Sequence, residues 1–151
     1  MLKTGTKAPD FKLKNQDGEE LSLSDLISDG SIVLYFYPKN ETYGCIKEAC
    51  AFRDQYEDFT AAGASVVGIS MDSVGSHQRF VNNRRLPFTL LSDPDGKVHK
   101  AYESEPSLFG VLRQRNTYVI DKEGVIRMAF TARLNFEKHV EEALRVVGTL
   151  S

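Results

Sequence analysis

The chain has 151 residues, of which 41% are hydrophobic and 26% charged, as expected for one globular domain that buries its own core. Its 19 lysines and arginines against 21 aspartates and glutamates give a formal net charge of −2, which argues against a broad basic surface for nucleic acid or anionic membranes. We therefore expect a single domain over residues 1–151 that binds neither nucleic acid nor a membrane.

No apolar segment of the sequence is long enough to form a membrane-spanning helix. The longest apolar run, residues 31–37, falls far short of the roughly 20 residues that such a helix needs. Residues 1–9 lack both the apolar stretch of a secretion signal and the Arg/Ser bias of a transit peptide. We expect a soluble cytoplasmic protein, or an organellar one, for example in a plastid, if a transit peptide has been removed.

The first predicted elements are a hairpin and a buried strand. Residues 11–14 and 21–23 alternate apolar and polar side chains around Asp17-Gly18, and glycine takes the positive φ that a hairpin turn requires. Residues 32–37 are continuously apolar and rich in aromatic and β-branched side chains. This composition predicts a strand that is central in the sheet and covered by helices on both faces.

The clearest helical pattern begins at Cys45. Apolar positions recur from there at spacings of four, three, four and three, namely Cys45, Ala49, Phe52, Tyr56 and Phe59. The pattern predicts one continuous helix that ends before Gly63. Residues 64–70 then predict a second buried strand, followed by a helix through Val81 and a strand at residues 88–91.

The last third of the chain predicts a hairpin and a closing helix. Residues 116–120 and 125–131 flank the turn sequence 121–124, and apolar residues at 136, 140, 144 and 147 follow helical spacing. The order is β-α-β first and β-β-α second. It predicts an α/β fold of the thioredoxin-like type, with a central mixed β-sheet flanked by helices and an N-terminal β-hairpin.

Two cysteines carry the chemistry that the sequence suggests, and they are too few for a disulfide scaffold. Pro38 ends the central strand, Thr42 and Gly44 shape a loop, and Cys45 falls in the first turn of the next helix. The unpaired N–H groups and the positive dipole end of a helix start favour thiolate over thiol. The alternative is that Cys45 is a small buried hydrophobic residue on the stripe facing the sheet.

A bond between Cys45 and Cys50 would require a conformational change. Residues five apart on an ideal helix lie about 140° apart around its axis, with Cα atoms about 8.6 Å apart. Bonded cysteines have Cα atoms closer than about 7 Å, so at least the first helical turn would have to unwind. The spacing differs from the C-x-x-C of thioredoxins, and a zinc site would need further ligands.

Residues 38–45, Pro-Lys-Asn-Glu-Thr-Tyr-Gly-Cys, resemble the peroxiredoxin signature Pro-x-x-x-Thr-x-x-Cys at all three fixed positions. Segments 44–54, 67–70, 86–93 and 117–121 resemble the Q-type subfamily, also called bacterioferritin comigratory protein, so the resemblance spans nearly the whole chain. Tyr43 and Ile46 depart from the proline and threonine usual in this subfamily. These departures affect the stiffness of the loop and the shape of the pocket.

The resemblance implies a thiol peroxidase that reduces hydrogen peroxide and organic hydroperoxides. It makes Cys45 the peroxidatic cysteine and Cys50 the resolving one, with an intramolecular disulfide that thioredoxin reduces, and it favours a monomer. It also gives Arg115 the role of supporting the thiolate and the peroxide, with Arg113 as the alternative and a solvated charge as the reading from sequence alone. The resemblance counts Thr42 with Cys45, Cys50 and Arg115 as catalytic, and the implied pocket residues are Pro38, Tyr37 and Gly44.

Two other functions stay open at this point. A protein disulfide reductase would share the fold, but it should carry C-x-x-C. A peroxide-sensing redox switch would use the same cysteine pair and pass its oxidation to a partner protein.

The remaining polar residues predict little chemistry. The three histidines, His77, His99 and His139, share no metal-ligand spacing, so we expect solvated or core roles, no metal and no cofactor. We expect Lys47 with Glu48, and Arg53 with Asp54, to form solvated pairs on the helix surface. A catalytic role for Glu48 or Arg53 is the less favoured alternative.

Overall fold

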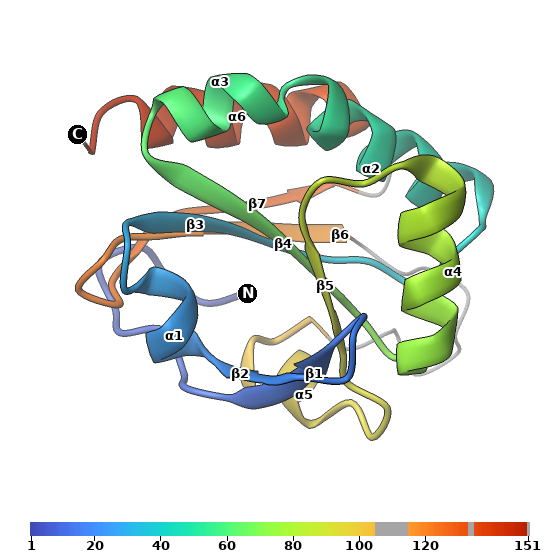
Figure 1. Ribbon diagram of the computed structural model, residues 1–151. Coiled ribbons are helices and arrows are strands. Elements are labelled where there is room, and N and C mark those ends of the chain that lie inside the picture. Colours follow the sequence, from blue (N-terminus) through green and yellow to red (C-terminus); the bar gives the residue numbers. More distant parts are fainter. Residues whose placement is uncertain (105–114, 133–134, 151) are drawn as a thin grey trace.

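The computed structural model describes residues 1–104, 115–132 and 135–150, and these contain one seven-stranded sheet in the order β2-β1-β5-β4-β3-β6-β7 (Figure 1). The strands are β1 (Lys12–Asn15), β2 (Glu20–Ser22), β3 (Ser31–Phe36), β4 (Ala64–Ser70), β5 (Thr89–Ser92), β6 (Arg115–Ile120) and β7 (Ile126–Ala132). The helices are α1 (Leu23–Ile27), α2 (Tyr43–Asp54), α3 (Tyr56–Ala61), α4 (Val74–Arg84), α5 (Lys97–Ala101) and α6 (Phe136–Val147). Within the described ranges, no helix is long and apolar enough to span a bilayer.

The predicted mixed sheet is confirmed. Strands β3, β4 and β5 are parallel, whereas β1 pairs with β5, β6 with β3, and β7 with β6 in antiparallel fashion. The N-terminal hairpin pairs β1 with β2 around Gly18, whose φ is 80°. Strand β3 lies between β4 and β6, so it is interior to the sheet, as its apolar sequence predicts.

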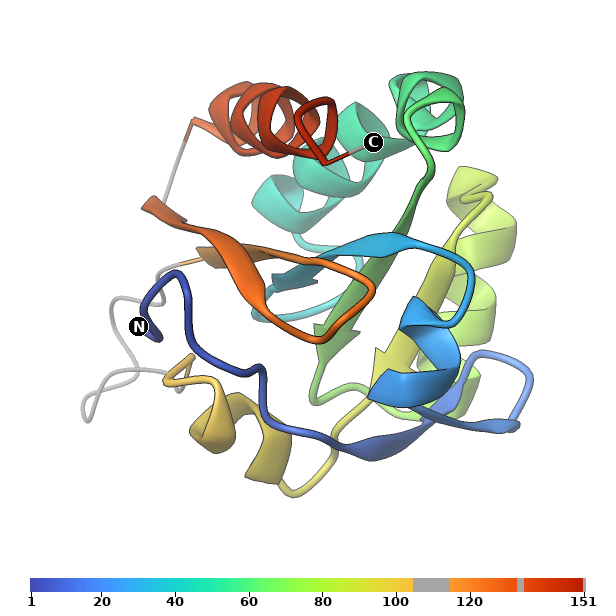
Figure 2. The ribbon, with the colours of Figure 1, turned by 90° about the vertical axis from the view of Figure 1, so that its left-hand side faces the viewer.

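The two faces of the sheet bury separate hydrophobic clusters. Helices α2, α3, α4 and α6 cover one face, and the short helices α1 and α5 lie on the other (Figure 2). Strand β3 feeds both clusters because side chains alternate along a strand. Its residues 33 and 35, with Tyr37 just beyond the strand, point toward α2, while residues 32, 34 and 36 point toward the other face.

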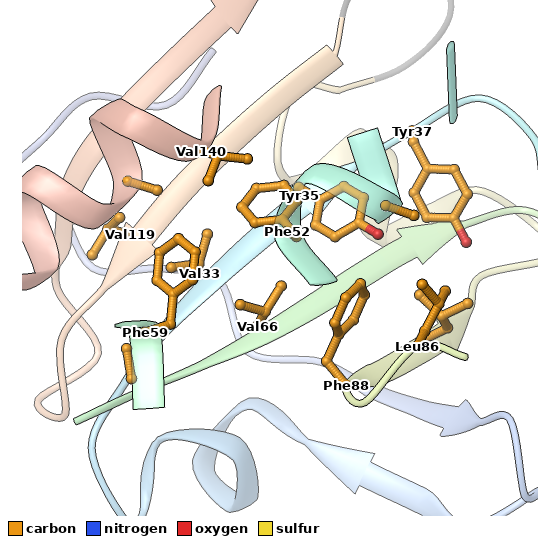
Figure 3. Close-up of a cluster of buried hydrophobic side chains, with 14 of the residues drawn as sticks. Val33, Tyr35, Tyr37, Phe52, Phe59, Val66, Leu86, Phe88, Val119 and Val140 are labelled. Atoms are coloured by element: carbon orange, nitrogen blue, oxygen red, sulfur yellow. The ribbon is translucent and has the colours of Figure 1, made fainter. Parts of the chain in front are cut away.

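Aromatic rings fix the C-terminal half of α2 to the sheet. The ring of Tyr35 stacks on Phe52 at a centroid distance of 4.7 Å and on Tyr37 at 5.3 Å (Figure 3). The first turns of α2 contribute the small side chains of Cys45 and Ala49 and the partly buried side chain of Ile46 to the same cluster. Since hydrophobic stabilisation scales with buried apolar area, the fully buried ring of Phe52 contributes more to holding α2 on the sheet than Cys45 or Ala49 does.

The prediction of one helix from Cys45 to Phe59 is wrong in one respect, because the helix is interrupted at Gln55. Gln55 adopts φ −104° and ψ 10°, and its carbonyl accepts from the N–H groups of both Asp58 and Phe59 at the start of α3. The apolar stripe continues across this interruption, since Phe52 and Phe59 lie 5.9 Å apart in the same cluster. A stripe alone therefore does not reveal the break.

Two helices of five residues each, α1 and α5, were not predicted. Helix α1 starts with a capping box in which Ser22 and Asp25 each accept from the other's backbone N–H, at 3.1 and 2.9 Å. Helix α4 extends past the predicted Val81 to Arg84, and it ends where Arg85 takes a left-handed φ of 52°. Helices of five residues, such as α1 and α5, have too few turns to show a periodic pattern in the sequence.

Candidate active site

Cys45 lies in the first turn of α2, with its side chain only 1% exposed. Thr42 is the N-cap, with extended backbone, and its carbonyl accepts from the Ile46 N–H at 2.9 Å. Cys45 thus combines both features that the sequence suggested, a position at a helix start and burial in the hydrophobic cluster. The free amides of this first turn, with the helix dipole, favour a negatively charged sulfur.

Arg115, the first residue of β6, brings a guanidinium to this sulfur. Its Nη1 donates to Cys45 Sγ at 3.1 Å and to Glu48 Oε1 at 3.3 Å, and its guanidinium carbon lies 5.1 Å from the ring centroid of Phe136. Arg115 is 7% exposed, so the alternative of a solvated charge is wrong. The other alternative, Arg113, lies outside the described residues.

Gly44 makes room for this guanidinium. A Cβ on residue 44 would collide with Arg115 Nη2 and would lie 3.1 Å from Phe136 Cζ. Any larger residue at position 44 would therefore displace the arginine from its place beside Cys45. The structure gives the glycine a steric reason that the loop prediction did not contain.

Glu48 is fully buried, so the prediction of a solvated Lys47–Glu48 pair is wrong for the glutamate. Burial raises the pKa of its carboxyl group to about 7, while the charge of Arg115 and its hydrogen bond act in the opposite direction. Its Oε2 has no hydrogen-bond partner among the residues that the structure describes. The signal was present in the sequence, because Glu48 follows Cys45 by three residues and precedes Phe52 by four, and so lies on the apolar stripe.

His139 of α6 lies on the far side of Glu48. Its Nε2 lies 3.1 Å from the carbonyl oxygen of Ala132, and its Nδ1 lies 2.8 Å from Thr117 Oγ1 and 3.9 Å from Glu48 Oε2. Burial is the main cause that lowers the pKa of His139, to about 4, so the ring is neutral at pH 7. A carbonyl can only accept, so Nε2 donates and Nδ1 accepts from the threonine hydroxyl.

Thr42, predicted to be catalytic, and the predicted pocket residues Tyr37 and Pro38 precede Cys45 in the chain. The Thr42 hydroxyl donates to the Lys39 carbonyl at 2.8 Å, and Thr42 is exposed. Tyr37 is buried, and its hydroxyl donates to Asn40 Oδ1 at 2.6 Å. Pro38 lies half-buried between them in the chain.

Asn40 fixes this loop from within a second buried network. Its amide nitrogen Nδ2 donates to Ser76 Oγ at 3.1 Å and lies 2.9 Å from His77 Nδ1, and its backbone N–H donates to Asp72 Oδ2 at 2.9 Å. His77 Nε2 lies 2.9 Å from the Leu91 carbonyl oxygen. The loop that leads to Cys45 is thereby tied to both α4 and the end of β4.

Cys50 lies on the same helix, half-buried, and both cysteines are free thiols. Tyr43, where Q-type peroxiredoxins usually have proline, is 76% exposed at the start of α2, and Lys47 lies over its ring at 5.6 Å. Ile46 packs against the hydrophobic cluster. The structure therefore shows the wound helix with reduced cysteines.

Among the described residues, no group of three or more histidine, cysteine, aspartate and glutamate side chains is placed to hold a metal ion. The three histidines are buried. The chemistry that the site supports is that of a sulfur nucleophile, with a helix start and a guanidinium to stabilise negative charge.

Comparison with known proteins points in one direction. Residues 4–129 match the AhpC/TSA family. A chloroplastic peroxiredoxin Q of Populus jackii is 49% identical over 146 residues, which cover 97% of this chain and 68% of that protein. Peroxidoxin BcpB of Mycobacterium tuberculosis superposes with a TM-score of 0.93 at 38% identity, covering 100% of this chain and 99% of that one. Peroxiredoxin Q of Xanthomonas campestris superposes with a TM-score of 0.83 at 29% identity, covering 92% and 90%.

Proposed function

Given that the chain belongs to the AhpC/TSA family and, within it, to the peroxiredoxin Q group, and is therefore a thiol-dependent peroxidase of thioredoxin-like fold, we propose that Cys45 is the sulfur that attacks the peroxide. The observation that carries this assignment is the contact of Arg115 Nη1 with Cys45 Sγ at 3.1 Å, in a buried site at the start of a helix. Cys50 is half-buried and lies in the next turn of the same helix.

The proposed first step is an in-line displacement at oxygen. The thiolate of Cys45 forms a bond to the terminal oxygen of the peroxide, the O–O bond breaks, and the other oxygen leaves as hydroxide or alkoxide. Arg115 is placed to donate hydrogen bonds to the oxygen atoms on which charge develops. Gly44 leaves space for the guanidinium, and Tyr37 and Pro38 hold the preceding loop. Thr42 would reach the peroxide only after its hydroxyl leaves the Lys39 carbonyl.

The proposed second step uses Cys50. Its thiol condenses with the sulfenic acid of Cys45, so that an S–S bond forms and water leaves. Both residues lie in α2, so the first turns of α2 must unwind before the sulfur atoms can meet. Opening these turns exposes Cys45, Ala49 and the partly buried Ile46, and it does not require the larger ring of Phe52 to leave the cluster.

We propose thioredoxin as the dithiol that reduces this disulfide, hydrogen peroxide and alkyl hydroperoxides as the substrates, and a monomer as the working form. One solved structure of the bacterioferritin comigratory protein from Xanthomonas campestris is described in terms of alkyl peroxide reduction, which supports the second substrate class. The plant relatives are named chloroplastic, and this supports a plastid as one of the two proposed locations, beside the cytoplasm.

Consumption of NADPH with thioredoxin, thioredoxin reductase and either hydrogen peroxide or an alkyl hydroperoxide tests these roles together. We expect steady turnover in the native protein and none in Cys45→Ser or Cys50→Ser. Cys50→Ser should still consume one equivalent of peroxide, whereas Cys45→Ser should consume none. No steady turnover in the native protein, with one equivalent of peroxide consumed, would instead favour a redox switch or a different reductant.

A further inference from the structure

One guanidinium faces two groups that can each carry a negative charge. Arg115 Nη1 is 3.1 Å from Cys45 Sγ and 3.3 Å from Glu48 Oε1. The sulfur and the carboxyl group both belong to buried residues, and Glu48 is completely shielded from solvent. A buried charge is stable only when it is paired, so one arginine balances one of these two anions and leaves the second uncompensated.

Among the residues that the structure describes, the other titratable groups around Glu48 do not supply a second positive charge. His139 of α6 is neutral, and its Nδ1 lone pair, which accepts from Thr117, lies 3.9 Å from Glu48 Oε2. Tyr35 of β3 interacts electrostatically with Glu48, and burial raises its pKa well above the usual value, so the phenol also stays neutral. Glu48 Oε2 is left without a hydrogen-bond donor within the described part of the chain.

We propose that Glu48 and Cys45 share a single ionisable proton in front of Arg115, so that Glu48 sets the fraction of Cys45 that is thiolate. With the proton on Glu48, Arg115 pairs with the thiolate. With the proton on Cys45, Arg115 pairs with the carboxylate. Glu48 is thus a positioning residue for charge that acts through Arg115. Burial raises the pKa of Glu48 to about 7, so this carboxyl group can hold or release a proton near neutral pH.

The peroxide reaction shifts this balance. A thiolate, a hydroperoxide and a protonated Glu48 become a sulfenic acid, an alcohol and an ionised Glu48, so atoms and charge balance. The sulfur loses its negative charge when its bond to oxygen forms, and Arg115 is then left to the carboxylate. Glu48 gives up one proton and the departing alkoxide takes up one proton, so no net proton is gained or lost. This inference deepens the proposed function, because it rests on Cys45 as the attacking thiol.

The first test titrates Cys45 alone, in a Cys50→Ser background, by the ultraviolet absorbance of the thiolate. We expect Glu48→Gln, which keeps an oxygen acceptor for Arg115 but cannot ionise, to raise the thiolate-to-thiol ratio near pH 7 by roughly threefold or more. Asp54→Asn is the matched control, since it removes the same charge from an exposed position on the same helix. An unchanged or lower ratio in Glu48→Gln would mean that Glu48 only holds Arg115 in place, and would overturn the proposal.

A second test reads Glu48 directly and needs no peroxide, so it can fail independently of the proposed peroxidase chemistry. Alkylation of the same Cys50→Ser protein with iodoacetamide forms a carbon–sulfur bond at Cys45, releases iodide and removes the charge of the sulfur. We expect the infrared difference spectrum at pH 7 to show loss of a protonated carboxyl C=O stretch, and we expect this band to be missing in Glu48→Gln. No loss of the band in the Cys50→Ser parent would refute the shared proton, even if peroxidase turnover is normal.

Discussion

The molecule contains two buried histidine networks on the same side of the sheet, and they differ in how well their polar atoms are satisfied. Around His77, both ring nitrogens have partners, and the side-chain oxygen and nitrogen of Asn40 are both bonded. Around His139 the ring is likewise satisfied, but one carboxyl oxygen of the adjacent Glu48 has no hydrogen-bond partner in the part of the chain that the structure describes. Arg115 there is shared between this carboxyl group and Cys45.

The two networks therefore have different roles: the one around His77 holds a loop in place, and the one around Glu48 lies beside the proposed reactive sulfur. A fully bonded network has one preferred arrangement, so the His77 network fixes the loop that leads into α2. In the proposed exchange, the Glu48 network has two arrangements, one with the proton on Glu48 and one with the proton on Cys45. Each network can be disturbed on its own, and the expected effects differ in kind as well as in size.

The largest effect on the rate of peroxide reduction should come from removing Arg115, whose positive charge faces both Cys45 and Glu48. We expect Arg115→Ala to lower the second-order rate constant for peroxide by about 100-fold or more, because the donor beside the sulfur is lost. Stopped-flow measurement with the reduced protein gives this constant directly. Arg79→Ala, at an exposed position on α4, is the control and should react at the native rate. A native rate in Arg115→Ala would shift attention to Arg113.

The next effect should fall on stability and arise in the His77 network. Asn40→Ala leaves Tyr37 Oη and His77 Nδ1 without their buried partner, and we expect a loss of about 2 kcal/mol in the free energy of unfolding. Urea denaturation measures it. Asn40→Ala should leave the ratio of thiolate to thiol at Cys45 nearly unchanged, which separates it from Glu48→Gln. An equal change in that ratio would mean that the two networks are not independent.

A pH-dependent effect distinguishes the two titratable groups of the His139 network. Folded Glu48 keeps its proton up to a pKa of about 7, whereas an unfolded glutamate releases it near 4.5, so its contribution to stability falls as the pH rises through this window. The pKa of His139 is lowered to about 4, so the unfolded chain binds the extra proton and the contribution of His139 rises with pH up to about 6.5. These two contributions oppose one another in the native protein.

Glu48→Gln removes one of the opposing contributions. We expect its stability relative to the native protein to be higher at pH 8 than at pH 5 by on the order of 2 kcal/mol, since only the native protein has to ionise a buried carboxyl group. Urea denaturation of both proteins at the two pH values provides the measurement. A stability difference that does not change with pH would show that Glu48 ionises as easily in the folded chain as in the unfolded one.

The smallest effect should come from the exposed ion pair beside the loop. Arg84 Nη2 lies 2.8 Å from Glu41 Oε2, and both side chains are more than a third exposed. We expect Arg84→Met to change the free energy of unfolding by less than about 0.5 kcal/mol, because water and salt screen such pairs. A loss as large as that of Asn40→Ala would show that the loop is held from its surface rather than from the buried network.

Much of the fold follows from periodicity. The apolar run at β3, the hairpin turn at Gly18 and the spacing along α6 each specify one element, and the structure confirms them. The interruption at Gln55 could not be predicted, because the stripe runs through it without a change of face. Helices α1 and α5 escaped prediction because five residues are too short to show a helical period.

Some residues of the candidate site could likewise be predicted from the sequence, and others could not. Local sequence places Cys45 at a helix start, and Glu48 could have been recognised from its position on the apolar stripe. The approach of Arg115 depends on pairing between strands that are distant in sequence, and it was expected only through the family resemblance. The position of His139 beside Glu48 had no local signal, because it depends on how α6 packs over the sheet. The catalytic roles of these residues stay predictions.

The exposed ring of Tyr43 offers a spectroscopic handle on α2. The chain contains no tryptophan, so Tyr43→Trp would introduce a single indole fluorophore at the first residue of the helix. Its 76% exposure means that the larger ring needs no space in the core. Emission from that indole, recorded as peroxide is added, would report in real time when the helix opens and closes around the two sulfur atoms.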